Sequence, residues 1–204
     1  MKNLTRLGRI SGRFLPLVLG AALMAPATAA AQIEVMPLIG VGELTDAAGE
    51  SYDAGLVVGL SVGARLSTLV SIQAQGEYDR LNIDNSIRVD EEGHVARLAL
   101  SPAFHLVRDK IDLSLGPTFG VWRFSTNFQV ANQEGSFTMR GTELGVRASM
   151  LFGASPLVSV GPTFGYVRMW TSKTCLKAIG SETCNTDPDR DDDGFWSLAF
   201  AARF

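Results

Sequence analysis

The chain has 204 residues, of which 18 are Lys or Arg and 21 are Asp or Glu, for a formal net charge of −3. Residues 1–31 contain four of the basic residues and no acidic ones, so residues 32–204 carry 14 basic against 21 acidic side chains, a net charge of −7. An acidic product of this kind is a poor partner for nucleic acid, which argues against that class of function.

Residues 1–31 have the pattern of a secretory signal peptide. Lys2, Arg6, Arg9 and Arg13 precede an apolar run over 14–24 that is too short to span a bilayer comfortably. Small residues at 29–31 then fit a cleavage site. The pattern predicts that residues 1–31 are removed and that 32–204 form one exported domain. The alternative is a membrane-anchoring helix.

Eight segments of residues 32–204 have the length and alternation of strands. They lie at 33–45, 54–65, 69–80, 94–106, 111–124, 140–152, 157–171 and 194–204. Along 69–80, Val70 and Ile72 alternate with Ser71 and Gln73, which gives one apolar and one polar face. No apolar run after residue 31 approaches the length of about 20 residues that a spanning helix needs. A membrane location would therefore require a closed barrel.

The connections alternate in length. Short links at 66–68, 107–110 and 153–156 alternate with long, polar and irregular segments predicted at 81–93, 125–139 and 172–193, and 46–53 is intermediate. Short turns at one end and long loops at the other are typical of outer-membrane barrels. An even strand number places both termini at the short-turn, periplasmic end. A soluble, lipocalin-like barrel also has eight strands, but with its apolar face inward.

The sequence Gly-Pro-Thr-Phe-Gly occurs twice, at 116–120 and at 161–165. The repeat suggests duplication of a hairpin. Proline removes a hydrogen-bond donor from the sheet, so its recurrence in the same register predicts a local bend or bulge.

Aromatic residues near the strand ends predict two girdles at the membrane interfaces. Those expected at the outer interface are Trp122, Phe124, Tyr166, Trp170, Phe195 and Trp196. Those expected at the inner interface are Phe104, Phe152 and Phe204.

The last strand places Trp196, Leu198, Phe200 and Phe204 on one face. It resembles the final strand of bacterial outer-membrane barrels, in which alternate apolar residues ending in Phe form the insertion signal. The chain resembles the small eight-stranded barrels that include the OmpA transmembrane domain, OmpX and OmpW. This resemblance implies an all-β, antiparallel, up-and-down transmembrane barrel with periplasmic termini. It also implies an outer-membrane location, contact with lipid and lipopolysaccharide, and recognition by the barrel insertion machinery.

The inward face is predicted to carry a polar network. Its members are Arg65, Gln73, Gln75, Glu77, Arg97, His105, Asp112, Glu143, Arg147 and Arg203. Side chains fill the interior of an eight-stranded barrel, and unpaired buried charges are costly, so opposite charges should pair. We expect a salt-bridged plug, and the alternative is a narrow conduit for small solutes.

Two features mark the segment before the last strand. Cys175 and Cys184 are close in sequence and exported, which predicts a disulfide. Asp187, Asp189, Asp191 and Asp193 resemble the start of a calcium loop, but Phe200 stands where the closing Glu should be. We interpret this run as a solvated loop tip, with weak calcium binding as the alternative and no other cofactor expected.

The sequence favours a non-catalytic structural or surface-interaction protein. A lipopolysaccharide-modifying enzyme is the alternative from another class, with Ser101 or Ser136 and His94 as its candidate residues. None of these residues forms a recognisable set of nucleophile, base and orienting acid.

Overall fold

The computed structural model describes residues 32–45, 53–82, 92–108, 110–130, 133–178, 181–186 and 193–204. The predicted signal peptide and most of the acidic run lie outside these ranges. The described residues form nine strands: β1 Gln32–Thr45, β2 Asp53–Arg65, β3 Val70–Asn82, β4 Glu92–Arg108, β5 Ile111–Val130, β6 Gln133–Gly153, β7 Ser159–Ala178, β8 Ser181–Asn185 and β9 Asp193–Arg203. Within them, no helix is long and apolar enough to cross a membrane.

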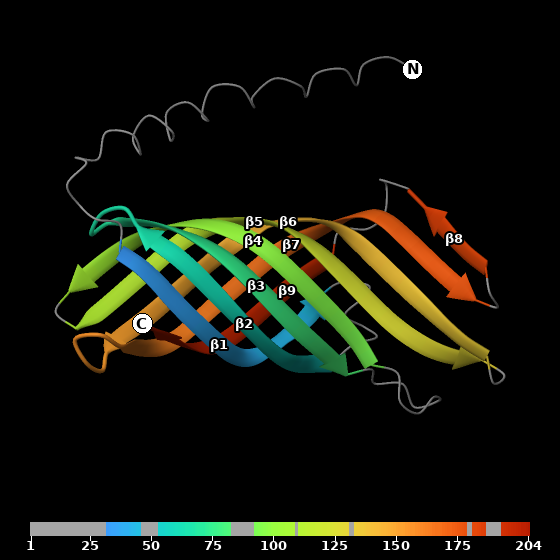
Figure 1. Cartoon of the computed structure of the whole chain (residues 1–204), viewed down its shortest axis with the longest axis horizontal. Coiled ribbons are helices and arrows are strands. Elements are labelled where there is room, and N and C mark those ends of the chain that lie inside the picture. The colour runs from blue at the N-terminus through green and yellow to red at the C-terminus, as the bar shows by residue number, and fades with distance from the viewer. Residues whose placement is uncertain are drawn as a thin grey trace, which may run out of the picture.

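Eight of the strands close into a barrel, which confirms the predicted antiparallel, up-and-down fold. Strands β1 to β7 pair with their neighbours in sequence order, and β9 pairs with both β7 and β1. Figure 1 shows the tilted strands wrapping around a common axis, with the C-terminus beside the short turns. Phe204 exchanges two backbone hydrogen bonds with Val35, so the last residue is held in the wall. We call this end of the barrel the short-turn end and the opposite one the long-loop end.

The apolar face of the wall points outward. Leu100, Leu198 and Phe200 are all exposed, whereas their strand neighbours of opposite parity are alanine or serine and are buried. This orientation is the reverse of that in a lipocalin-like binder, whose apolar side chains face an internal ligand. The sequence alternation therefore describes an inside-out barrel.

The prediction of long, irregular loops at 125–139 and 172–193 is wrong. Strand β5 continues to Val130 and β6 begins at Gln133, so the two form a hairpin that extends past the barrel wall. Strand β7 continues to Ala178 and pairs with β8, where the predicted disulfide links Cys175 to Cys184. In the first segment, Phe137 and Met139 still pack against the core, although many polar residues surround them in the sequence. Figure 1 shows this extension at the end opposite the C-terminus.

An apolar core fills the long-loop half of the lumen, and it corrects the expected outer girdle. Trp122, Phe124 and Phe195 are nearly fully buried and belong to this core, together with Leu81 and Val95. The parity of these residues explains why they are buried, since side chains two residues apart lie on the same face of a strand. Of the six residues expected in the outer girdle, only Tyr166, Trp170 and Trp196 have outward parity.

The repeated Gly-Pro segments lie at breaks in the ladders, but the register is the same on both sides of each break, so the bulge considered from sequence is not present. The β4–β5 ladder skips from Leu100↔Phe119 to Phe104↔Leu115, which brackets Pro117. A Cβ atom on the adjacent Gly116 would lie 1.9 Å from a backbone oxygen of β4, so only glycine permits this close approach. The second copy repeats the arrangement: a Cβ atom on Gly161 would lie 2.0 Å from a backbone oxygen of β6.

Candidate functional site

The inner wall carries two separate groups of charged side chains. The central cluster consists of Gln75, Glu77, Asp79, Arg97, Glu143 and Arg147. The end cluster lies at the short-turn end and consists of Glu34, Arg65, Ser71, His105, Asp112 and Arg203. All ten residues predicted for the lumen have inward parity, and Gln73 lies between the two groups, 3.5 Å from the Ser71 hydroxyl.

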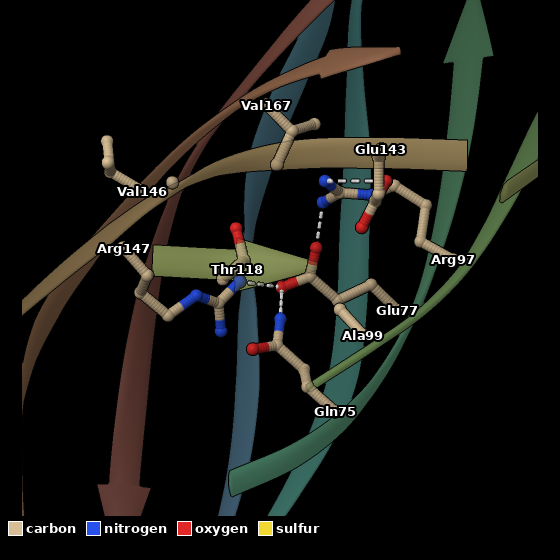
Figure 2. Close-up of a pocket in the computed structure, with 10 residues that line it drawn as sticks. Gln75, Glu77, Arg97, Ala99, Thr118, Glu143, Val146, Arg147 and Val167 are labelled. Carbon is tan, nitrogen blue, oxygen red and sulfur yellow. Dashed lines mark hydrogen bonds and ion pairs between the residues drawn. The ribbon is translucent and has the colours of Figure 1, made fainter. Parts of the chain in front are cut away.

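Glu77 is the hub of the central cluster. Its carboxylate accepts hydrogen bonds from both Arg97 and Arg147 and from the Gln75 side-chain amide, as Figure 2 shows. The same Arg97 also donates from Nε to Asp79 Oδ2 at 3.3 Å and lies 4.0 Å from Glu143 Oε2. One arginine therefore joins three carboxylates that come from two sides of the barrel.

Strand register and small residues bring these side chains together. Glu77 lies directly opposite Arg97 in the β3–β4 ladder, so this pair is set by the sheet itself. Glu143 and Arg147 come from β6 and reach across the lumen (Figure 2). Glycines at the paired positions of the adjacent strands make room: Gly120 of β5 lies directly opposite Glu143, and a Cβ atom there would lie 2.8 Å from Glu143 Oε1. One on Gly59 would lie 2.9 Å from Glu77 Cγ.

Little space remains inside the central cluster. The cavity between its side chains and Thr118 is about 10 Å³, which is roughly the volume that one water molecule needs. On the side of the long-loop end, the Arg97 guanidinium lies 4.2 Å from the ring centroid of Phe195, a cation–π contact. The central cluster is thus sealed against the apolar core that follows it along the barrel axis.

The end cluster is organised around Asp112. Arg65 donates to Asp112 at 2.6 Å, and Arg203 donates to the same carboxylate. Both arginines also lie within 4 Å of Glu34, at 3.5 and 3.8 Å. Because Arg203 belongs to β9 and Arg65 to β2, these ion pairs tie the last strand to the other side of β1. The cluster therefore reinforces the place where the barrel closes.

Part of the end cluster has the contacts of a hydrolase triad, from serine to histidine to aspartate. Ser71 Oγ lies 2.8 Å from His105 Nε2, and His105 Nδ1 lies 2.9 Å from Asp112 Oδ1. However, Ser71 is 0 % exposed, and Arg65 Nη2 lies 2.8 Å from the same His105 nitrogen that faces Asp112. A nucleophile must reach its substrate, so this arrangement fits a packed polar network better than a catalytic site.

The serines and the histidine considered for catalysis do not meet. Ser101 faces the lumen and donates to the backbone oxygen of Pro117 at 2.9 Å, whereas His94 lies on the opposite face of the same strand. His94 stacks on Tyr78, with ring centroids 5.5 Å apart. Ser136 lies on β6, two strands from β4 and so roughly 10 Å from His94.

The remaining candidate residues lie at the long-loop end. Asp193 is buried at the start of β9, opposite Met169, while Asp187, Asp189 and Asp191 lie outside the described residues. Trp196, Leu198, Phe200 and Phe204 have outward parity along β9 and its end.

Three members of the clusters were absent from the predicted network. Ser71 and Asp79 share the parity of Gln73 and Glu77, so the alternation of β3 already implied their position. Glu34 was harder to identify because its inward neighbours on β1, Met36 and Leu38, are apolar. Phe195 has the parity of Arg203, which the sequence analysis places inside.

This closed, inside-out barrel with a charged interior is the fold of the small outer-membrane β-barrel proteins. Neisserial surface protein A matches with a TM-score of 0.55 and 14 % identity, over 84 % of this chain and 95 % of that one. Ail, the attachment invasion locus protein of Yersinia pestis, matches with a TM-score of 0.55 and 14 % identity, over 85 % and 99 % of the two chains.

A major outer membrane protein from Thermus thermophilus matches with a TM-score of 0.58 and 11 % identity, over 84 % of this chain and 99 % of that one. No protein-family model matches the sequence, and no curated protein does either. At these identities the likeness concerns the fold.

Proposed function

We propose that the chain is a non-catalytic outer-membrane barrel with a closed lumen and a structural or surface-interaction role at its long-loop end. The observation that carries the proposal is the combination of an exposed apolar outer face with a lumen filled by paired charges and an apolar core. An apolar belt of this extent suits lipid rather than water. The proposal includes export by cleavage after Ala31 and insertion guided by β9.

The filled lumen favours a plug over the alternative of a narrow solute channel. The central cluster leaves a cavity of only about 10 Å³, and the core on its outer side is apolar. A conducting path would have to separate Glu77 from two arginines in a space that water scarcely enters, which is costly. Solute transport is therefore not the role that this geometry supports best.

The β5–β6 hairpin and the β7–β8 pair favour a role at the surface. They extend the wall beyond the barrel, and the Cys175–Cys184 disulfide restrains one of them. Ordered strands present side chains at a lower entropic penalty than flexible loops do, which suits recognition. Catalysis on lipopolysaccharide lacks comparable support, since Ser71 is buried and Ser101 and His94 lie on opposite faces.

Cell fractionation with gel mobility tests the location. We expect the protein in the outer-membrane fraction, with a mobility that changes on heating as the barrel unfolds. A soluble periplasmic protein, as a lipocalin-like binder would be, contradicts the proposal.

Epitope insertion tests the orientation. An epitope after Thr186, at the long-loop end, should bind antibody on intact cells. The matched control is an epitope between Ser155 and Pro156 in the β6–β7 turn, which should bind only after permeabilisation. The opposite result would place the extension in the periplasm and contradict the proposed surface role.

Weak calcium binding by the acidic run remains a prediction. Calorimetry with calcium on the refolded protein measures it directly. Heat above that of dilution, lost when Asp189 and Asp191 are both changed to Asn, would support a site. No such heat is the result expected of a solvated loop tip.

A further inference from the structure

The outer face of β5 changes abruptly from apolar to polar at Arg123, which belongs to a row of residues that crosses β5, β6 and β7. On the short-turn side of this row, the outward residues of β5 are Ile111, Leu113, Leu115, Pro117, Phe119 and Val121. On the other side they are Ser125 and Asn127. The row therefore lies where the lipid-facing belt ends, which is the level of lipid headgroups.

Three cations occupy this row. Arg123 lies directly opposite Arg140 in the β5–β6 ladder, and Arg140 lies directly opposite Lys173 in the β6–β7 ladder. Like charges directly opposite each other destabilise a sheet. Between the residues that the structure describes, no ion pair involves any of the three. Among the described residues, no ion pair therefore offsets this repulsion, and an external anion would do so.

A groove adjoins the row. It has a volume of about 470 Å³ and is lined by Arg123, Arg140, Thr142 and Ser172 together with the apolar Leu98 and Val121. It lies beside an irregularity in the β6–β7 register between Arg140 and Gly141, where the Ser172 hydroxyl donates to the backbone oxygen of Arg140 at 3.1 Å. The groove offers cations and hydroxyls on one side and apolar contact on the other, so it suits an amphiphile.

We propose that Arg123, Arg140 and Lys173 bind the phosphates of a bis-phosphorylated glycolipid, the lipid A part of lipopolysaccharide, with an acyl chain against Leu98 and Val121. Guanidinium groups bind phosphate in bidentate fashion, and an ammonium adds a compact point charge. The strands of Arg123 and Lys173 are two strands apart, roughly 10 Å, a spacing that suits two phosphates carried by one sugar headgroup.

This inference rests on the proposed function, because only a barrel in the outer membrane meets this lipid. The binding test uses the full chain, folded in detergent micelles, with fluorescent diphosphoryl lipid A as probe. The test variant is Arg123→Gln, Arg140→Gln and Lys173→Gln together. The matched control is Arg108→Gln with Lys110→Gln, two exposed cations at the short-turn end.

We expect the triple variant to bind diphosphoryl lipid A at least tenfold more weakly, while the control stays within twofold of the unchanged protein. Monophosphoryl lipid A should bind the unchanged protein more weakly than the diphosphoryl form. Inorganic phosphate should not compete, because it lacks the acyl chain. Equal binding by the triple variant, an equal loss in the control, or a preference for phosphatidylglycerol would overturn the assignment.

A second measurement keeps the inference testable if the triple variant folds poorly. Without lipid, Arg140→Gln should be at least as stable as the unchanged protein, because it relieves the repulsion along the row. With lipid A present, the unchanged protein should gain more stability than this variant, since binding stabilises the folded state. Equal gains would contradict the site. Fractionation reports the proposed function separately, so the two failures are distinguishable.

Discussion

The central and end clusters are both built on arginine–carboxylate pairs, but they lie in different surroundings. In the centre, the side chains of Arg97, Arg147 and Glu77 are 5 %, 8 % and 2 % exposed. At the short-turn end, those of Arg65 and Arg203 are 18 % and 14 % exposed. The arginine–carboxylate pairs are thus sealed from water in the central cluster and partly exposed to water in the end cluster. Under the proposed function, the central pairs would close the lumen, and the end pairs would hold together the strands that meet there.

The two clusters should therefore differ in how much stability is lost when one partner of an ion pair is removed. A buried ion pair adds little net stability over apolar packing, but breaking it leaves an uncompensated charge. Near a mouth, water solvates the remaining charge and the loss is smaller. The following substitutions test this contrast.

The largest effect is expected for Glu77→Gln. It removes the carboxylate that both Arg97 and Arg147 share, so the free energy of unfolding should fall by roughly 3–5 kcal/mol. The measurement is urea unfolding of the protein in lipid vesicles. Glu34→Gln in the end cluster is the matched control and should lose clearly less, and equal losses would remove the distinction between the clusters.

A smaller effect is expected for Arg203→Gln. It removes one of two arginines that donate to Asp112, and Arg65 remains in place, so the loss should be roughly 1–2 kcal/mol. Added salt should reduce this loss more than the loss from Glu77→Gln, because screening acts on exposed charges. Unfolding at low and high salt checks this, and an equal salt response in both variants would count against it.

The smallest effect is expected for Ser71→Ala, about 1 kcal/mol, because one hydrogen bond to His105 is lost. The folded, unchanged protein should also resist labelling by a fluorophosphonate, since Ser71 is fully buried. Labelling that disappears in Ser71→Ala would show that the triad-like arrangement is an active hydrolase site.

Much of the fold followed from parity and loop length. The alternation along β3, β4 and β6 placed Glu77, Arg97 and Arg147 inside before their contacts were known. The same rule, applied from Asp112 along β5, also places Trp122 and Phe124 inside, whereas their depth along the strand alone points to a girdle.

Other features could not come from sequence. Whether Arg147 on β6 reaches Glu77 on β3 depends on the tilt and stagger of the closed barrel, which no single strand encodes. The extension of β5 and β6 past residue 124 is hard to predict, because polar residues mask the alternation and Phe137 and Met139 are its main inward apolar residues. Glu34 was missed because its strand has a mixed inner face.

Single-channel recording in planar bilayers tests the closed lumen most directly. The unchanged protein should show no steady conductance steps, because the central cluster leaves a cavity of only about 10 Å³ and the apolar core follows it along the barrel axis. Each preparation should first show heat-modifiable mobility, so that only folded barrels are compared. Discrete conductance through the unchanged protein would contradict the plug and favour a solute channel.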